Sequence, residues 1–156
     1  MTSDELYLKI ANYCAYQDRS VAEVLKKMND WQVPLEFHET FIELLISENY
    51  LNQERYASSY IRGKSQLKKW GKNKIKIHLQ QKGIPQELIQ EKLNDLNTED
   101  YLHIATKIAQ TKLVSLQKET DKRVLKQKIL RHLIGKGYEF DIAQKAYNLA
   151  IENNYD

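Results

Sequence analysis

The sequence has few of the residues that interrupt helices or cross-link chains. Its 156 residues include five glycines, two prolines and one cysteine. The single cysteine, Cys14, cannot form an internal disulfide or a zinc site by itself, so we expect a small buried side chain. No apolar run approaches the ~20 residues that span a bilayer, and two acids precede the first lysine, unlike a secretory signal. These absences predict a globular cytoplasmic protein without a membrane segment.

Carboxylates are missing from one long segment. Between Glu54 and Glu87 the chain has nine lysines and arginines and no aspartate or glutamate. Residues 1–54 carry a net charge of −6, residues 55–97 carry +7 and residues 98–156 carry +2. A field of one sign concentrates polyanions, either a nucleic-acid backbone or an acidic protein surface. Lysine-rich stretches are often only the solvated faces of helices, but the absence of acidic counter-charges favours a binding surface.

Motifs for catalysis and metal binding are also missing. None of the four histidines, His38, His78, His103 and His132, lies three or four residues from another histidine or beside the cysteine. The chain has no glycine loop that cradles phosphate and no nucleophile elbow. We therefore expect no metal, no cofactor and no enzymatic activity.

Apolar residues recur at three- and four-residue spacing, which predicts an all-α protein. Ser20 with Glu23 three residues later is typical of a capping box. The segment from Lys74 to Leu79 alternates as a strand would, but its repeat partners have helical spacing, so we predict a helix there. The expected helices are 4–17, 20–30, 35–48, 53–67, 71–82, 86–96, 98–118, 121–136 and 140–153.

The turn residues are periodic. Val33-Pro34 and Ile84-Pro85 lie 51 residues apart, and the pattern Leu79-x-x-Lys82-Gly83 recurs 54 residues later as Leu133-x-x-Lys136-Gly137. This register aligns three sets of apolar residues: Val24, Ile75 and Ile129; Met28, Leu79 and Leu133; and Phe37, Leu88 and Ile142. His78 and His132 also coincide, which indicates a structural role for both. The pattern predicts three tandem three-helix repeats, residues 1–51, 52–97 and 98–156, in an elongated, curved chain.

Most aromatic residues have the spacing of core side chains, as at Tyr7, Tyr13, Tyr16, Tyr56, Tyr60 and Tyr101. Trp70 differs because lysines surround it in the sequence. It could stack on a base, as aromatic residues of single-strand binders do. It could instead fill the interface between the first two helices of the middle repeat, and this packing role is favoured because tryptophan is usually largely buried.

The stretch from Tyr50 to Pro85 resembles the signature of the RecX family of bacterial recombination regulators. The matching positions are Tyr50, Leu51, Glu54, Arg55, Tyr56, Ala57, Tyr60, Gly71, Ile75, Leu79, Lys82, Gly83 and Ile84. The chain departs from the family pattern at Asn52-Gln53, where acidic residues are more usual, and at Tyr56, where phenylalanine is usual. The resemblance implies tandem three-helix repeats and no enzymatic activity. It also implies binding to RecA, the recombinase that coats single-stranded DNA, along the filament groove, with restraint of its ATPase, coprotease and strand-exchange activities.

We expect a monomer whose contact surface for the RecA filament, and for single-stranded DNA if the chain touches it directly, is basic. The predicted contact residues are Arg55, Arg62, Lys64, Lys68, Lys69, Trp70, Lys72, Lys74 and Lys76, with a second patch of Lys122, Arg123, Lys126 and Arg131. Two alternatives stay open. One is an autonomous nucleic-acid-binding module of helix-turn-helix type, and the other is an adaptor that binds an acidic protein.

Overall fold

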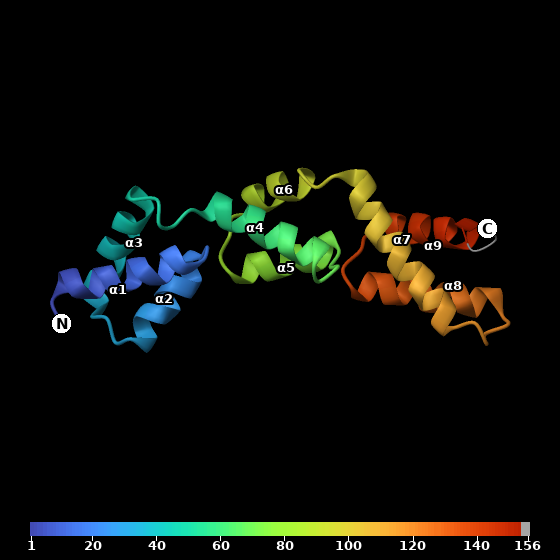
Figure 1. Cartoon of the computed structure of the whole chain (residues 1–156), viewed down its shortest axis with the longest axis horizontal. Helices are drawn as coiled ribbons and strands as arrows, with labels where there is room; N and C mark the ends of the chain where they lie inside the picture. The colour runs from blue at the N-terminus through green and yellow to red at the C-terminus, as the bar shows by residue number, and fades with distance from the viewer. Residues whose placement is uncertain (154–156) are drawn as a thin grey trace. The chain divides into compact units, whose positions relative to one another are not determined.

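The computed structural model describes residues 1–153, and this part of the chain contains helices and no strands (Figure 1). The helices are α1 (Ser3–Tyr16), α2 (Val21–Asp30), the short 3-10 helix η1 (Leu35–Phe37), α3 (His38–Ser47), α4 (Gln53–Gln66), α5 (Lys72–Gln81), α6 (Gln86–Asn94), α7 (Thr98–Ser115), α8 (Lys122–Gly135) and α9 (Phe140–Asn153). The all-α prediction is confirmed, and the expected helix ends agree to within three residues. The segment from Lys74 to Leu79 is helical despite its strand-like alternation.

The predicted capping box at the start of α2 is present. The Ser20 side chain accepts a hydrogen bond from the Glu23 amide at 3.1 Å, and the Glu23 carboxylate accepts one from the Ser20 amide at 3.3 Å. These bonds satisfy amide groups that have no partner within the helix. A second capping box, between Thr2 and Glu5, starts α1 in the same way.

The three-helix repeat is visible in one turn geometry that recurs after the second helix of every repeat. After the second helix of each repeat, an amide donates to the carbonyl five residues back: Val33 to Met28 (2.9 Å), Ile84 to Leu79 (3.1 Å) and Tyr138 to Leu133 (3.1 Å). The residue before each donor has a positive φ: Gln32 (56°), Gly83 (79°) and Gly137 (101°). This is the hydrogen-bond pattern of a Schellman helix ending. Two of the aligned apolar sets lie just before these turns, and all their side chains are 0% exposed. They are Val24, Ile75 and Ile129, and Met28, Leu79 and Leu133.

The described chain forms two compact units. Unit 1 comprises Met1–Tyr60 and Leu79–Lys92, and unit 2 comprises Ile61–His78 with the described residues from Leu93 onward. Helices α4, α5 and α6 (Gln86–Asn94) therefore each contribute residues to both units.

Unit 1 contains a core formed by α1, α2 and α3. Its most buried side chains include Ile10, Met28 and Leu45, each 0% exposed. Cys14 belongs to this core as predicted, and burial raises the pKa of its thiol to about 11. Trp31 lies at the edge of the core, where its ring meets Tyr13 with centroids 5.8 Å apart and Lys9 Nζ lies 4.3 Å from the ring.

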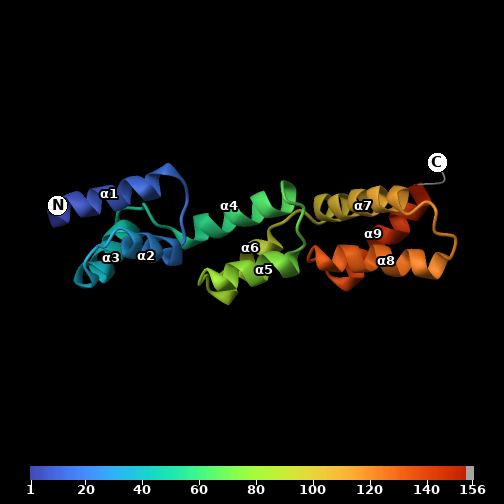
Figure 2. The ribbon, with the colours of Figure 1, turned by 90° about the horizontal axis from the view of Figure 1, so that it is seen from below.

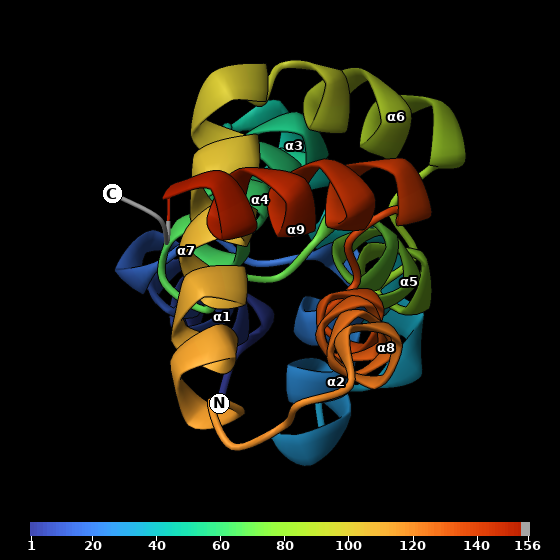
Figure 3. The same ribbon diagram turned by 90° about the vertical axis from the view of Figure 1, so that its right-hand side faces the viewer.

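Unit 2 contains a core in which α7, α8 and α9 pack against one another (Figure 2). Figure 3 shows α9 passing across α7. Small residues allow this close approach, because fully buried alanines occupy both helices: Ala105 and Ala109 on α7, and Ala143, Ala146 and Ala150 on α9. No helix among residues 1–153 combines the length and the apolar character needed to cross a bilayer.

Candidate functional site

The carboxylate-free segment of residues 61–78 belongs entirely to unit 2. It holds seven lysines and arginines: Arg62 and Lys64 on α4, Lys68 and Lys69 in the α4–α5 loop, and Lys72, Lys74 and Lys76 on α5. We call the segment of residues 61–78 the basic elbow. Within residues 1–153, the side chains of Arg62, Lys68, Lys69 and Lys76 make no ion pair or hydrogen bond, so their charges are available to a ligand.

Trp70 lies at the centre of the basic elbow. Its ring is half-buried and contacts the His78 ring, with centroids 4.6 Å apart. Lys64 Nζ lies 4.8 Å and Lys74 Nζ 4.5 Å from the indole centroid, within the range of cation–π interactions. The indole therefore packs between side chains of α4 and α5, in line with the packing role expected for it. A base-stacking role stays a prediction.

The basic elbow is fixed to the turn between α8 and α9 by backbone hydrogen bonds. The Gly71 amide donates to the Lys136 carbonyl at 2.8 Å, and the Asn73 amide donates to the Gly137 carbonyl at 2.9 Å. The first amides of a helix have no partner within it, so this turn serves as the cap of α5. A Cβ on Gly71 would lie 2.2 Å from the Gly137 carbonyl carbon, and only glycine permits this approach.

Two buried tyrosines complete this joint. The Tyr138 hydroxyl donates to the Lys69 carbonyl at 3.0 Å. The Tyr101 hydroxyl accepts from the Lys72 amide at 2.8 Å and donates to the Glu139 carboxylate. Burial, followed by the hydrogen bond to Glu139, raises the pKa of Tyr101 far above its ordinary value, so the hydroxyl stays a donor at neutral pH. The joint therefore holds the backbone of residues 69–73 in one position.

The second predicted patch lies on α8, but its members do not share one face. Lys122 and Lys126 are four residues apart and lie on the same side of the helix. Arg131 is nine positions from Lys122, roughly two and a half turns, and so faces the opposite side. Carboxylates are also close, since Asp121 caps the helix by accepting from the Arg123 amide at 2.9 Å. The α8 cations are therefore a weaker candidate than the basic elbow.

Arg55 lies in unit 1 and has internal partners. Its Nε donates to Asp18 Oδ1 at 2.7 Å, and one terminal nitrogen donates to the carbonyls of Asn49 and Tyr50 at 3.2 and 3.3 Å. These bonds tie the first turn of α4 to the loop before it and to the segment before α2. Arg55 thus has a structural task, and its predicted contact with a partner stays a prediction.

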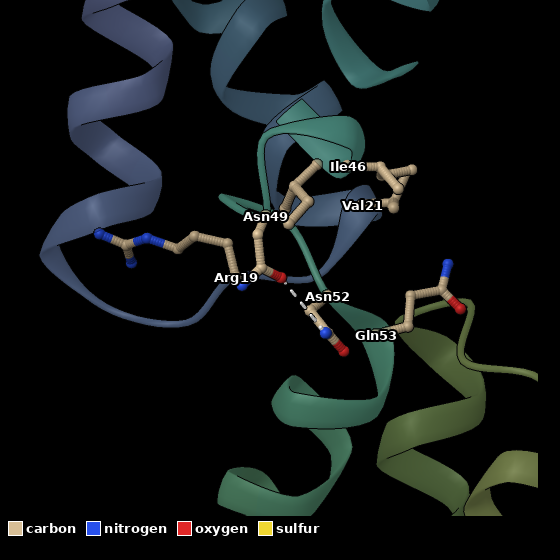
Figure 4. A pocket seen from close by; sticks show the side chains of 7 residues that line it. Arg19, Val21, Ile46, Asn49, Asn52 and Gln53 are labelled. Carbon is tan, nitrogen blue, oxygen red and sulfur yellow. Dashed lines mark hydrogen bonds between the residues drawn. The ribbon is translucent and has the colours of Figure 1, made fainter. Parts of the chain in front are cut away.

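A cavity of about 360 Å³ lies in unit 1 (Figure 4). Its polar lining consists mainly of amide side chains, and Asn52 Nδ2 donates to Asn49 Oδ1 at 3.5 Å. Its one charged group, Arg19, is already engaged, because Nε donates to the Tyr13 carbonyl at 3.2 Å and the guanidinium lies 3.8 Å from the Tyr13 ring centroid. No carboxylate or histidine lines the cavity, so its walls offer no acid–base pair. Among residues 1–153, no three metal-ligating side chains cluster either.

A second cavity, in unit 2, was not foreseen from the sequence. It has a volume of about 210 Å³, and its polar lining includes Lys69, Lys107, Lys112 and His132. Only Lys69 was among the predicted contact residues. The i, i+4 spacing of Lys107, Thr111 and Ser115 on α7 indicates a shared face. No sequence pattern indicates that Lys69 and His132 line the same cavity as that face.

Comparison with known proteins gives consistent matches. Family models described as the second and the third three-helix domain of RecX match residues 52–93 and 99–147. The regulatory protein RecX of Clostridioides difficile (strain 630) is 31% identical over 161 residues, which cover 98% of this chain and 72% of the relative. That of Clostridium perfringens (strain 13 / Type A) is 40% identical over 115 residues, which cover 73% of this chain and 53% of the relative. The chain thus matches only about half the length of several such relatives.

Solved structures have the same fold. The crystal structure of RecX from Lactobacillus salivarius superposes with a TM-score of 0.85 at 24% identity, covering 94% of this chain and 95% of that one. Another crystal structure of regulatory protein RecX gives a TM-score of 0.84 at 26% identity, covering 93% of this chain and 71% of that one. These similarities confirm the fold of tandem three-helix domains. The predicted boundaries at residues 51 and 97 stay a prediction.

Proposed function

This chain belongs to the RecX family of regulatory proteins, and on that premise we propose that it binds RecA filaments on single-stranded DNA and restrains their activity. In this proposal the chain catalyses no reaction and acts by occupying the filament. The observation that carries the proposal is the basic elbow, seven cations without a carboxylate in residues 61–78. A filament that contains single-stranded DNA presents a polyanion, which such a segment attracts.

The repeat architecture supports binding to a filament rather than to a single pocket. Each three-helix repeat can make a modest contact with a neighbouring part of the partner. Linked modest contacts add through effective concentration, so no single contact has to be strong. The cavity in unit 1 offers no acid–base pair of the kind that catalysis at a pocket requires, because no carboxylate or histidine lines it.

The direct test is a comparison of three targets at one salt concentration. Fluorescence anisotropy would measure binding to RecA assembled on single-stranded DNA with a nucleotide analogue, to RecA alone and to bare DNA. We expect the filament to bind most tightly. Equal affinity for the filament and for bare DNA would contradict the proposal, and the helix-turn-helix alternative would then lead.

A direct contact with DNA is part of the proposal, supported by the unpaired charges of Arg62, Lys68, Lys69 and Lys76. If four to six phosphates are neutralised, log K for bare single-stranded DNA should fall against log salt with a slope of about −3 to −4. A flat response would remove phosphate contact from the proposal. The basic elbow would then face an acidic surface of RecA.

A further inference from the structure

The cavity in unit 2 gathers positive charge from three separate elements. Lys69 comes from the α4–α5 loop, Lys107 and Lys112 come from α7, and His132 comes from α8. No carboxylate lines the cavity. Within residues 1–153 the three ammonium groups have no ion pair or hydrogen bond. Like charges on the walls of one cavity repel one another, and an anion bound there would reduce that repulsion.

The hydroxyls that line the cavity do not offer their protons to a ligand. Thr111 Oγ1 donates to the Lys107 carbonyl at 3.0 Å, and Ser115 Oγ donates to the Lys112 carbonyl at 2.7 Å. Donors to a bound group therefore come from the lysines and the His132 ring. Ammonium groups are point charges that bind phosphate oxygens without a fixed geometry. This donor set fits an anion with several oxygens and does not fit a metal ion.

We propose that this cavity binds a phosphate group of single-stranded nucleic acid. The assignment rests on the proposed function, because the strand in question is the DNA of the filament. Lys69 links the cavity to the proposed path of a nucleic-acid strand, because it lines the cavity and also belongs to the basic elbow. Lys68 precedes it and Trp70 follows it in the sequence. Single-strand binders combine a cationic path along the backbone with an aromatic platform for a base. The cavity supplies a cationic site of this kind, and Trp70 is the aromatic residue next to Lys69 in the chain.

His132 makes binding at this site sensitive to pH. Burial lowers the pKa of His132, and Lys112 and Lys136 lower it further, so the free protein keeps the ring neutral at neutral pH. The charged groups that face the ring are these two lysines together with Lys69 and Lys107 of the cavity lining. A bound phosphate adds a negative charge that favours the protonated ring. Binding should therefore take up a proton and strengthen as the pH falls.

The test uses two pairs of substitutions in the whole chain. The cavity variant is Lys107→Gln with Lys112→Gln. The control is Lys118→Gln with Lys145→Gln, which removes the same charge from two exposed lysines outside the cavity. Glutamine has nearly the helix propensity of lysine, so both proteins should fold, as circular dichroism will verify. For bare single-stranded DNA, the cavity variant should bind about tenfold more weakly. Its salt slope should shrink by about 0.7, the value for one phosphate, whereas the control should stay within about threefold of the parent protein.

A second measurement follows His132 directly. In the parent protein, nuclear magnetic resonance should show the His132 titration moving to higher pH when an oligonucleotide is added, and the cavity variant should lose this shift. Equal DNA binding by the cavity variant and the control would overturn the inference. So would an identical His132 shift with inorganic phosphate at the same concentration, or tighter binding of polyglutamate than of DNA. Parallel binding to RecA filaments separates the two proposals, because failure of the parent protein to bind filaments refutes only the proposed function.

Discussion

Replacing Gly71 by alanine tests whether the joint between the basic elbow and the α8–α9 turn positions the binding surface. The added Cβ would lie 2.2 Å from both the Gly137 carbonyl carbon and the Tyr138 amide nitrogen. Both atoms belong to the backbone and cannot rotate away. Gly71→Ala must therefore push the elbow away from the turn.

The cost follows from the bonds that this separation breaks. Three hydrogen bonds link the elbow to the turn. The Gly71 amide donates to the Lys136 carbonyl, the Asn73 amide donates to the Gly137 carbonyl, and the Tyr138 hydroxyl donates to the Lys69 carbonyl. At about 0.5–1.5 kcal/mol for each hydrogen bond, their loss lowers the free energy of unfolding by about 1.5–4.5 kcal/mol. Urea denaturation followed by circular dichroism would measure the change, and filament binding should weaken with it.

Gly63 provides a matched control for the same substitution. It lies inside α4, and a Cβ there would meet nothing within 4 Å. Alanine is favoured over glycine inside a helix by roughly 0.5–1 kcal/mol, so Gly63→Ala should stabilise the protein slightly. The two substitutions should thus have opposite signs. A Gly71→Ala protein as stable as the parent would refute the joint as a source of stability and rigidity.

The remaining predictions concern the elbow charges and the buried core. Replacing Lys72, Lys74 and Lys76 together by glutamate should abolish restraint of RecA ATP hydrolysis while the helical circular-dichroism signal is kept. The free energy of unfolding should fall by about 1.5 kcal/mol, at about 0.5 kcal/mol for each charge, and Lys74 also loses its contact with Trp70; normal restraint would rule out the elbow as the contact site. Leu79→Ala should instead lower the free energy of unfolding by about 2–5 kcal/mol in chemical denaturation, since Leu79 is 0% exposed. Burial raises the pKa of the Cys14 thiol to about 11, whereas the pKa of a cysteine in the unfolded chain is about 8.5. The protonated thiol therefore contributes its full share of the folding stability below about pH 8.5, and this contribution is lost as the pH rises toward 11. A Cys14→Ala protein should therefore lose less stability over that range of pH, and equal losses would show that the thiol is not the titrating group.

The sequence predicted the repeat well because the repeat is local. Turn residues and apolar spacing act over a few positions, so the positions aligned with Met28 are buried in all three repeats. Even the first turn fits, although Gln32 takes the positive φ that glycine has in the other two. Tyr16 is an exception among the tyrosines expected in the core, since it is 83% exposed at the end of α1.

The candidate site was predicted less completely because its geometry depends on contacts between distant segments. Charge counting found the basic elbow, which is continuous in the sequence. It could not find the cavity, where Lys69 meets α7 and His132 from far along the chain. It also missed the carboxylate that pairs with Arg55, because that partner, Asp18, lies 37 positions earlier in the chain. The divided faces of α8, by contrast, follow from helical periodicity alone and were within reach of the sequence.

The placement of the two tryptophans gives each compact unit its own optical reporter. Trp31 belongs to unit 1 and Trp70 to unit 2, and the sequence has no other indole. Trp31 sits against Tyr13, whereas Trp70 sits against His78 and two ammonium groups, so their emission spectra should respond to different events. Single-tryptophan proteins made by Trp31→Phe or Trp70→Phe would let unlabelled protein report, by fluorescence alone, which unit senses a partner first and which unfolds first.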